Sequence, residues 1–444
     1  MNYYKPSIFN YCQRVEVNGK EFNLIYNTLS RELLSISPAY QPIEFLATVR
    51  QPGEVRELVS RGFLVEDGTN EISVALNEVE KKRCSDKRMV VTIIPTDACN
   101  FMCSYCYQSE LNHFMDSLTC TSIIKWLDNA LWSCNELYLS WFGGEPLLCK
   151  RQIVDMMRQV KEICKSHRVS LVSHITTNGY ELDYFTFSEL LKCNVLYYQI
   201  TIDGNSETHN KQRPHKTKTD SYERIINNLI NIKERSCNKR FEIGIRINVS
   251  ESMTDEVIRD FIDNMAILFG DDHRFVLIWQ WVRDWGGTRI LNKKDDLVLR
   301  DNNRCLEFAK EALDKGLLCS EQMSSKGGVD TCEAFYKNGY VINYDGRVMK
   351  CAMHMNNERN CIGYITSTGE LVINQEEERI WQRSPLIHDR CKECALLPQC
   401  LSNRCFFAEK IGEKLKCVEY KAMVPGMLGA MIEKGKYISM EATK

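Results

Sequence analysis

Three cysteines lie close together in the stretch "TDACNFMCSYCYQ", residues 96–108. They are Cys99, Cys103 and Cys106, and their spacing is C-x3-C-x2-C. Thiolates are preferred ligands of iron–sulfur clusters and of zinc, and four of them complete either kind of site. Three on one loop therefore predict an iron–sulfur cluster with one open corner, a zinc site with a distant fourth ligand, or buried cysteines without a metal. An open corner on a cluster would leave one iron able to bind another molecule.

A second group of cysteines occupies the last quarter of the chain. The pattern is C-x13-G-x4-C, then C-x2-C-x5-C-x4-C, then one more cysteine. The chain has 21 cysteines and no apolar signal segment at its start, which favours metal ligation over disulfides. On spacing alone, two structural zinc sites explain this group as well as iron–sulfur clusters do. The residues are Cys332, Cys351, Cys391, Cys394, Cys400, Cys405 and Cys417.

Polar side chains and glycines follow three further apolar runs that read as strands. "WFGGEP" ends one run, and its two glycines would let a ligand approach the backbone closely. "TTNG" and "TIDG" end the next two runs and supply hydroxyl, amide and carboxylate groups. Each motif alone is also typical of an ordinary turn. The candidates are Gly143, Gly144, Glu145, Pro146, Thr177, Asn178, Thr201 and Asp203.

These motifs lie in a region where apolar strands alternate with amphipathic helices. Near-continuous apolar strands joined by helices predict a parallel sheet covered by helices, here a partial (β/α)6 TIM-like barrel of the α/β class. Ligands bind at the carboxyl ends of such strands, where the motifs stand. Strands are expected at 90–95, 136–143, 171–179, 196–204, 241–249 and 275–282, with helices near 118–132, 150–167, 183–192, 220–235 and 254–267.

Other segments flank this barrel. Residues 1–80 predict a winged-helix-like module, with a hairpin at Asn18-Gly19, two short helices, and a second hairpin at Asp67-Gly68. A polar linker is expected at 81–88, the barrel at 89–300, and a bridging helix at 301–318. The cysteine-rich region, 319–420, shows little regular periodicity and predicts a small metal-held domain. A tail, 421–444, completes the chain.

Charge and hydropathy exclude some classes of function. The 444 residues have a net charge of −2, so the chain shows no bias toward nucleic acid or an acidic membrane. No apolar run approaches the ~20 residues that a membrane span needs. We therefore expect a cytoplasmic protein with no nucleic-acid or membrane partner. The basic stretch "KQRPHKTKT", 211–219, reads as a solvated loop, with contact to an acidic peptide as the alternative.

"CNFMCSYCY" followed by "GGEP" resembles the radical S-adenosylmethionine (radical SAM) superfamily. The resemblance covers roughly 89–282, and Tyr105 matches the aromatic position before the third cysteine. It implies a [4Fe–4S] cluster on the three cysteines, whose fourth site is taken by the amino and carboxylate groups of S-adenosyl-L-methionine. "GGEP" then resembles the segment that holds the methionine amino group. By position, Thr201, Asp203 and Arg224 resemble contacts to ribose and the methionine carboxylate, and Asn178 belongs to the same rim.

The second cysteine group resembles the SPASM domain of radical SAM enzymes, although its last interval is x4 where x3 is usual. Family precedent implies two auxiliary clusters. One would be held by Cys391, Cys394, Cys400 and Cys417, and the other by Cys332, Cys351 and Cys405. The fourth ligand of the second cluster stays open between Cys319, Cys361 and a substrate thiolate.

The amino-terminal plan resembles the peptide-recognition element of peptide-modifying radical SAM enzymes, where a leader peptide adds a strand to a sheet edge. The resemblance thus predicts a maturase of a ribosomally made precursor peptide, with flavodoxin or ferredoxin as one-electron reductant. Hydrogen abstraction by a 5′-deoxyadenosyl radical would lead to a thioether or carbon–carbon crosslink. Asp284 is a candidate proton acceptor, although a solvated loop acid explains it as well.

Three alternatives remain at this point, and one of them is a quinone-cofactor or other peptide oxidase. A sulfatase-maturing, formylglycine-forming enzyme would share both cysteine regions, but the roughly 90 residues before the triplet argue against it. From a different class, a zinc-stabilised peptide-binding protein would carry out no redox chemistry and would have no need of "GGEP".

Overall fold

The computed structural model describes most of the chain and divides it into two compact units. The described residues are 4–17, 19–109, 111–238, 240–284, 289, 295, 303–319, 332–355, 357–412, 417, 424, 428, 431–432 and 437–440. Unit 1 contains Met1–Arg83 and Arg383–Lys444, together with 321–331, and unit 2 contains Cys84–Ser320 and Cys332–Gln382. The amino-terminal segment therefore shares a unit with the last part of the cysteine-rich region.

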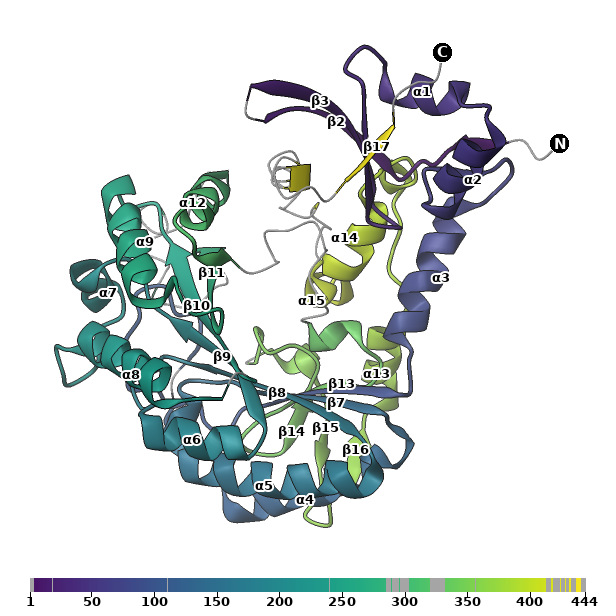
Figure 1. Cartoon of the computed structure of the whole chain (residues 1–444). Helices are drawn as coiled ribbons and strands as arrows, with labels where there is room; N and C mark the ends of the chain where they lie inside the picture. The colour runs from purple at the N-terminus through teal and green to yellow at the C-terminus, as the bar shows by residue number, and fades with distance from the viewer. Residues whose placement is uncertain are drawn as a thin grey trace. The chain divides into compact units, whose positions relative to one another are not determined.

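Unit 1 is built on a four-stranded sheet in the order β17-β4-β3-β2 (Figure 1). The strands are β2 (Asn10–Val17), β3 (Lys20–Asn27), β4 (Glu32–Ile36) and β17 (Ile438–Met440). The three amino-terminal strands pair antiparallel, and β17 pairs parallel with β4. The predicted hairpin is confirmed, and Gly19, with φ +71°, takes the left-handed conformation that its turn requires.

The helices of unit 1 begin where proline fixes the first turn. α1 (Pro42–Thr48) and α2 (Pro52–Ser60) both carry proline at their first position, and they match the two predicted helices. The predicted second hairpin is wrong in its second half. β5 (Leu64–Glu66) pairs with β1 (Tyr4–Pro6), but α3 (Glu71–Arg83) follows and covers the start of the predicted linker. Its apolar residues at Ala75 and Val79 are buried at helical spacing.

Both faces of the unit 1 sheet are covered. Ile25 and Leu34 pack with Phe45 and Leu58 of the helices, and Ile438 and Met440 of β17 lie against this cluster. On the other face, Leu24 and Tyr26 pack with Leu396, Val424 and Leu428. The Gln399 amide of α14 (Leu397–Asn403) donates to the Tyr26 hydroxyl at 2.8 Å, and α15 (Phe406–Lys410) follows. Burial on both faces fixes the register of this small sheet.

Unit 2 contains an eleven-stranded sheet in the order β12-β11-β10-β9-β8-β7-β6-β13-β14-β15-β16. The six central strands run parallel and follow the sequence order, as predicted for a partial barrel. They are β6 (Arg88–Ile93), β7 (Glu136–Trp141), β8 (Ser170–Thr177), β9 (Val195–Thr201), β10 (Glu242–Val249) and β11 (Phe275–Trp281).

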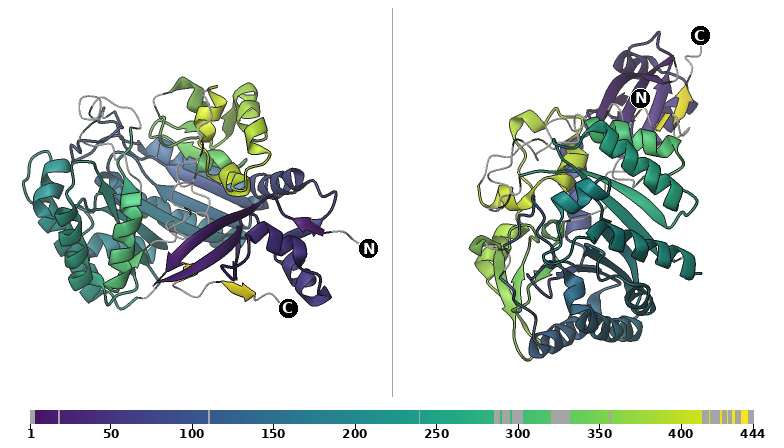
Figure 2. Two further views of the ribbon diagram at one scale, coloured as in Figure 1. Left: turned by 90° about the horizontal axis from the view of Figure 1, so that it is seen from above. Right: turned by 90° about the vertical axis from the view of Figure 1, so that its left-hand side faces the viewer.

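Helices cover the outer face of the curved sheet of unit 2, and Figure 2 shows them from two further sides. They are α4 (Ser117–Ala130), α5 (Lys150–His167), α6 (Tyr184–Lys192), α7 (Ser206–Gln212), α8 (Ser221–Arg235) and α9 (Asp255–Phe269). All but α7 were predicted. Asp116, Asp183 and Thr254 cap three of them through their side chains.

The edges of the sheet come from later parts of the chain. α12 (Asn303–Asp314) leads to β12 (Leu318–Cys319), which pairs with β11. β13 (Gly339–Ile342) pairs parallel with β6, and β14 (Arg347–Met349), β15 (Cys361–Ile365) and β16 (Leu371–Ile373) extend the sheet antiparallel. α13 (Gln375–Gln382) ends the unit. Residues 332–382 are therefore more regular than their sequence predicts. In the described part of the chain, no helix is long and apolar enough to cross a membrane.

Candidate radical SAM site

The cysteine triplet lies in the loop that leaves β6. Cys103 is buried, and Cys99 and Cys106 are partly buried. Burial raises the pKa of Cys103 to about 11 and raises that of Cys99 as well, because desolvation disfavours the thiolate. Arg213 lowers the pKa of Cys103 in opposition to burial. The protein thus holds the triplet in a poorly solvated place and brings a cation near its central member.

The glycines of "GGEP" let the loop after β7 touch the loop that leads to the cysteines. A Cβ on Gly144 would lie 2.2 Å from the Ala98 carbonyl oxygen, and one on Gly143 would lie 2.5 Å from that of Thr96. Gly143 also has φ +127°, a conformation that side chains rarely allow. The Glu145 amide donates to the Ala98 carbonyl at 2.8 Å. The two glycines are therefore required for this backbone contact.

Glu145 joins the ends of β7 and β8. Its carboxylate accepts hydrogen bonds from the Thr177 hydroxyl at 2.6 Å, the Asn178 amide at 2.7 Å and the Leu147 amide at 2.9 Å. It is fully buried, and burial raises its pKa. The Asn178 side chain then donates to Asn100 Oδ1, between the first two cysteines, at 2.7 Å. Among the described contacts, the Glu145 side chain therefore orders the rim of strand ends.

Asp203 and Tyr105 bind each other in a buried network. The Tyr105 hydroxyl donates to Asp203, and Asp203 Oδ1 accepts from the Asn248 backbone amide at 2.8 Å. Arg213 Nη1 donates to the Tyr105 oxygen at 2.6 Å and lies 3.9 Å from Asp203 Oδ2. Burial raises the pKa of both Asp203 and Tyr105. Asp203 is 0% exposed, so in this conformation its carboxylate serves the network.

The other predicted site residues differ in exposure. Thr201, at the end of β9, is buried on the same rim. Arg224, on α8, is exposed; its Nε donates to the Tyr180 carbonyl at 3.0 Å, and its Cζ lies 4.5 Å from the Tyr180 ring centre. Asp284 follows β11 and is exposed. The roles predicted for these three residues stay predictions.

Of the second cysteine group, unit 2 holds Cys332 and Cys351. The loop at Cys351 is fixed by Asn360, which is fully buried: Asn360 Oδ1 accepts from the Cys351 amide at 2.9 Å, and its Nδ2 donates to the Cys351 carbonyl at 2.7 Å. Cys361 follows directly and pairs in register with Met349. Cys319 instead accepts from Trp279 Nε1 at 3.4 Å and donates to the Ala309 carbonyl at 3.5 Å. Of the two suggested fourth ligands, Cys361 lies nearer Cys351 in the sheet.

The remaining cysteines belong to unit 1. Cys391, Cys394 and Cys400 are partly buried, and Cys405 and Cys417 are exposed. Arg404 is buried beside them, and its Nη1 donates to the Leu386 carbonyl at 2.6 Å. Within the residues that the structure describes, no group of three or more Cys, His, Asp or Glu could hold a single metal ion. Ligation by these cysteines therefore stays a prediction.

Several buried, hydrogen-bonded polar residues were not predicted from the sequence. Arg213 lies in the stretch read as solvated, which is wrong at this position, since Arg213 is buried. Asn248 precedes the end of β10, where a polar residue among apolar ones was a usable signal. Lys350 is 2% exposed, and its ammonium donates to three carbonyls. In sequence alone, basic residues such as Arg213 and Lys350 read as surface residues.

Buried polar atoms around the triplet lack partners among the described residues. They belong to side chains of the cysteine loop and of the segment beside it: Asn100 Nδ2, Ser104 Oγ, Gln108 Oε1, Gln212 Oε1 and Arg213 Nε. Buried polar groups are nearly always hydrogen-bonded in a complete protein. The loop therefore fits a bound polar group, in keeping with three thiols that lack a fourth ligand.

Comparison with known proteins agrees with this geometry. Residues 93–265 match the model of the radical SAM superfamily. The chain is 24% identical over 346 residues to a cysteine-type anaerobic sulfatase-maturating enzyme of Clostridium novyi, covering 71% of this chain and 87% of that protein. It is 25% identical over 197 residues to an S-adenosylmethionine-dependent nucleotide dehydratase of Psychrobacter lutiphocae, covering 40% of this chain and 62% of that protein.

Solved structures show the same fold. Native anSMEcpe, described with bound AdoMet and Kp18Cys peptide, superposes with a TM-score of 0.55 and 17% identity over 78% of this chain and 98% of its own. The same protein with AdoMet alone gives 0.54. Radical SAM enzymes use a [4Fe–4S] cluster and S-adenosylmethionine, so the predicted cofactor class is confirmed, and the zinc-stabilised binding protein is excluded. The sequence match shows that residues 93–265 form a radical SAM domain, and the shared fold and the cysteine loop at the end of β6 agree with it.

Proposed function

We propose that this enzyme modifies a ribosomally made precursor peptide. One observation carries the proposal: a radical SAM domain occurs in one chain with a second compact unit, which combines the amino-terminal segment with residues 383–444 and whose β2 is a sheet edge among the described strands. Edge strands present unpaired amide and carbonyl groups and bind extended peptides by strand addition. A domain for radical chemistry and a unit suited to peptide capture fit a peptide maturase.

In this proposal Cys99, Cys103 and Cys106 hold the cluster, and the backbone of Gly143–Pro146 receives the methionine part of S-adenosylmethionine. Asn178 and Thr201 lie on the same rim of strand ends and are assigned to the cofactor as well. If bound there, S-adenosylmethionine would supply a 5′-deoxyadenosyl radical on one-electron reduction. The task of the surrounding residues is to hold the cofactor and the target carbon together and to exclude water.

Each crosslink removes two hydrogen atoms from the peptide. The target carbon of the peptide loses a hydrogen atom to the 5′-deoxyadenosyl radical. A peptide thiol, or a second carbon, then forms a bond to that carbon and loses a proton and one electron. An auxiliary cluster would accept this electron, and Cys391, Cys394, Cys400 and Cys417 would be one complete ligand set for it. The initial electron comes from flavodoxin or ferredoxin, and the cytoplasm stays the predicted compartment.

The edge available to the peptide is β2. The opposite edge strand, β4, already pairs with β17, whose Ile438 and Met440 lie on the core. Strand addition at β2 needs no rearrangement of the described strands of unit 1. We therefore assign β2 (Asn10–Val17) as the docking edge.

A second candidate is the sulfatase-maturating reaction. It is favoured by the similarity over 346 residues to the Clostridium novyi enzyme. The match covers 98% of the anSMEcpe chain but only 78% of this chain, so the present chain has additional residues outside the shared fold. That difference favours a peptide with its own docking segment over a sulfatase.

The test compares two substrates with the same reconstituted enzyme, S-adenosylmethionine and reductant. One is the product of a short, cysteine-rich reading frame beside the gene, and the other is a cysteine-containing sulfatase peptide. The proposal predicts a precursor product lighter by two hydrogen atoms per crosslink, with the sulfatase peptide unchanged. Formylglycine in the sulfatase peptide, with an unmodified precursor, would reverse the assignment.

A further inference from the structure

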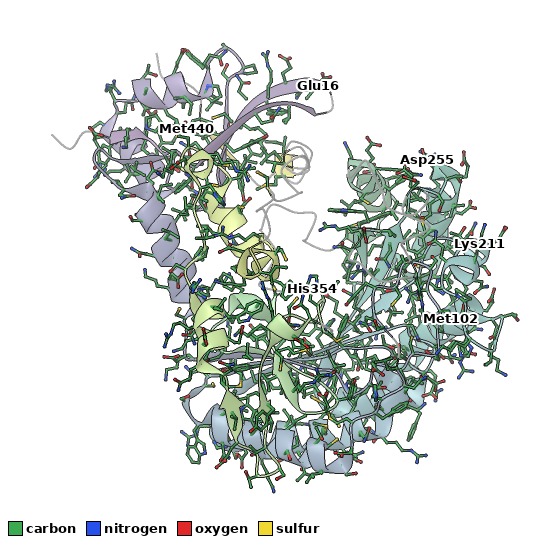
Figure 3. All side chains as sticks on the ribbon, turned by 180° about the vertical axis from the view of Figure 1, so that it is seen from behind. Glu16, Met102, Lys211, Asp255, His354 and Met440 are labelled. Carbon is green, nitrogen blue, oxygen red and sulfur yellow. The ribbon has the colours of Figure 1, made fainter. Side chains whose placement is uncertain are left out.

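The cysteine loop is one strand of a short antiparallel ladder, and its partner is the segment 212–216. Figure 3 labels Met102 on the first segment and Lys211 beside the second. The two segments share three backbone hydrogen bonds and one bridge, all in a single register. The bonds run from Met102 N to Pro214 O, from Ser104 N to Gln212 O and from Lys216 N to Asn100 O, each 2.9 Å long, and the bridge joins Phe101 to His215.

This register places Cys103 directly opposite Arg213. The hydrogen-bonded pairs are 100 with 216, 102 with 214 and 104 with 212, so 103 and 213 form a non-hydrogen-bonded pair between them. In an antiparallel ladder, such pairs have the closest side chains, and both side chains point to the same face. Arg213 is thus the cross-strand neighbour of the central cysteine.

Ring contacts confirm that these side chains share one face. Phe101 and His215, the next pair along, have ring centres 5.6 Å apart. The Cζ of Arg213 lies 6.0 Å from the Phe101 ring centre and 5.9 Å from that of Tyr105. The guanidinium is therefore held between the two aromatic residues that flank Cys103.

Arg213 is a buried cation that its protein partners do not fully satisfy. It is 8% exposed, its Nη1 donates to Tyr105, and its Nε has no partner among the described residues. Asp203 lies 3.9 Å away, and its oxygens already accept from Tyr105 and Asn248. A buried charge is costly unless it is paired, so a site with further negative charge is expected beside it.

We propose that Arg213 is a positioning residue that fixes the cysteine loop and raises the reduction potential of its cluster. The inference rests on the cluster assignment of the proposed function. A cluster gains negative charge on reduction, and a fixed cation in a poorly solvated place stabilises the more negative state. Because Arg213 belongs to a rigid ladder, its charge is present before reduction and needs no rearrangement.

The experiment measures the midpoint potential of the triplet's cluster by electron paramagnetic resonance in enzyme reconstituted anaerobically. All variants are made in the Cys391→Ala/Cys394→Ala double variant, which removes the paramagnetic signal of one auxiliary cluster. Arg213→Gln is expected to shift the midpoint potential to more negative values. The potential of Arg213→Lys is expected to stay near that of the parent, because lysine keeps the positive charge although it lacks the planar guanidinium. Tyr105→Phe removes a hydrogen bond without a charge and is expected to shift the potential less than Arg213→Gln.

Arg274→Gln is the control for loss of an arginine. Arg274 lies before β11, and its guanidinium donates to Asp272 and to the carbonyls of Ser236 and Lys233, so the variant loses contacts remote from the triplet. An unchanged potential in Arg213→Gln with full iron content would overturn the inference. The Arg213→Gln variant could lose the triplet's cluster altogether. In that case, an Arg213→Lys variant that keeps the cluster supports a role for the positive charge, and loss of the cluster in both variants overturns the inference. Absence of a cluster in the parent enzyme would instead reject the proposed function.

Discussion

Glu145 and Asn178 connect the ends of two neighbouring strands: the Glu145 carboxylate accepts a hydrogen bond of 2.7 Å from the Asn178 backbone amide. The Asn178 side chain then reaches Asn100 in the cysteine loop. Three strand-end loops thus share one chain of hydrogen bonds, and each holds the next in place. Disturbing any link should affect the cofactor site before it affects the sheet.

Glu145→Gln is expected to destabilise the protein by about 1–3 kcal/mol. The Glu145 carboxylate accepts hydrogen bonds from three buried donors, and the substitution replaces one of its two accepting oxygens with an NH₂ group, which cannot accept them. We also expect weaker binding of S-adenosylmethionine, measured by isothermal titration calorimetry. The control is Glu181→Gln, which removes a partly exposed ion pair with Lys150 and should cost less than about 1 kcal/mol. Equal losses in the two variants would contradict the linking role of Glu145.

Gly144→Ala is expected to displace the cysteine loop, since the added Cβ would lie 2.2 Å from the Ala98 carbonyl oxygen. A backbone clash of this kind costs about 1–3 kcal/mol and should lower the iron content of the reconstituted enzyme. Gly53→Ala is the matched control, because nothing lies within 4 Å of its Cβ and the residue belongs to a helix. Unchanged iron content in Gly144→Ala would show that the contact is dispensable.

Cys361→Ala should change the spectrum of an auxiliary cluster, whereas Cys319→Ala should not. Cys361 is joined to the Cys351 loop through Asn360, but the Cys319 thiol bonds to Trp279 and Ala309. Electron paramagnetic resonance of the two variants, with and without precursor peptide, makes the comparison. Unaltered auxiliary signals in Cys361→Ala that change on adding peptide would favour a substrate thiolate as the fourth ligand.

Binding of the precursor peptide should slow hydrogen exchange in β2 and leave β4 unchanged, because β17 already covers β4. Removal of residues 437–444 provides the control. If the peptide docks on β2, its affinity is unaffected by this deletion. Increased affinity after the deletion, with protection of Leu34–Ile36, would place the docking edge at β4 instead.

Lys410 gives a pH dependence that can be measured. Burial lowers its pKa to about 8 from an ordinary value of 10.5, and its ammonium donates to the Arg383 carbonyl at 3.1 Å. The folded protein therefore binds fewer protons than the unfolded chain between pH 8 and 10.5, and the contribution of Lys410 to stability rises with pH there. The free energies of unfolding of wild type and Lys410→Met are compared by denaturation. The wild type should gain stability relative to Lys410→Met as the pH rises over this range. A constant difference would contradict the lowered pKa.

The sequence was most informative where periodicity and motif coincide. The six parallel strands and five of their helices were predicted within a few residues, because a strand buried on both faces can be recognised from its composition. The triplet and "GGEP" could be recognised because closely spaced cysteines are typical of metal ligation and paired glycines of close backbone contact. Their placement at neighbouring strand ends followed from the parallel topology.

Other parts depend on contacts that local sequence does not encode. α3 was read as a strand because "EISVAL" has apolar residues at both spacings, and packing decides between them. β13 to β16 are short, and pairing with β6, the first strand of the parallel part of the sheet, stabilises the first of them. Arg213 was read as solvent-exposed because its neighbours are basic, yet the ladder with the cysteine loop buries it. Glu145 and Asp203 were assigned to a ligand, and the structure shows both engaged in networks that order the loops.

The most direct measurement is the fate of S-adenosylmethionine in the presence of dithionite and the anaerobically reconstituted protein. Wild type should be brown and should form methionine and 5′-deoxyadenosine in equal amounts. The Cys103→Ala variant should form neither, while keeping the auxiliary clusters that its other cysteines hold. A wild-type protein that binds no iron after reconstitution, or that binds iron and leaves S-adenosylmethionine intact, would contradict the assignment of Cys99, Cys103 and Cys106.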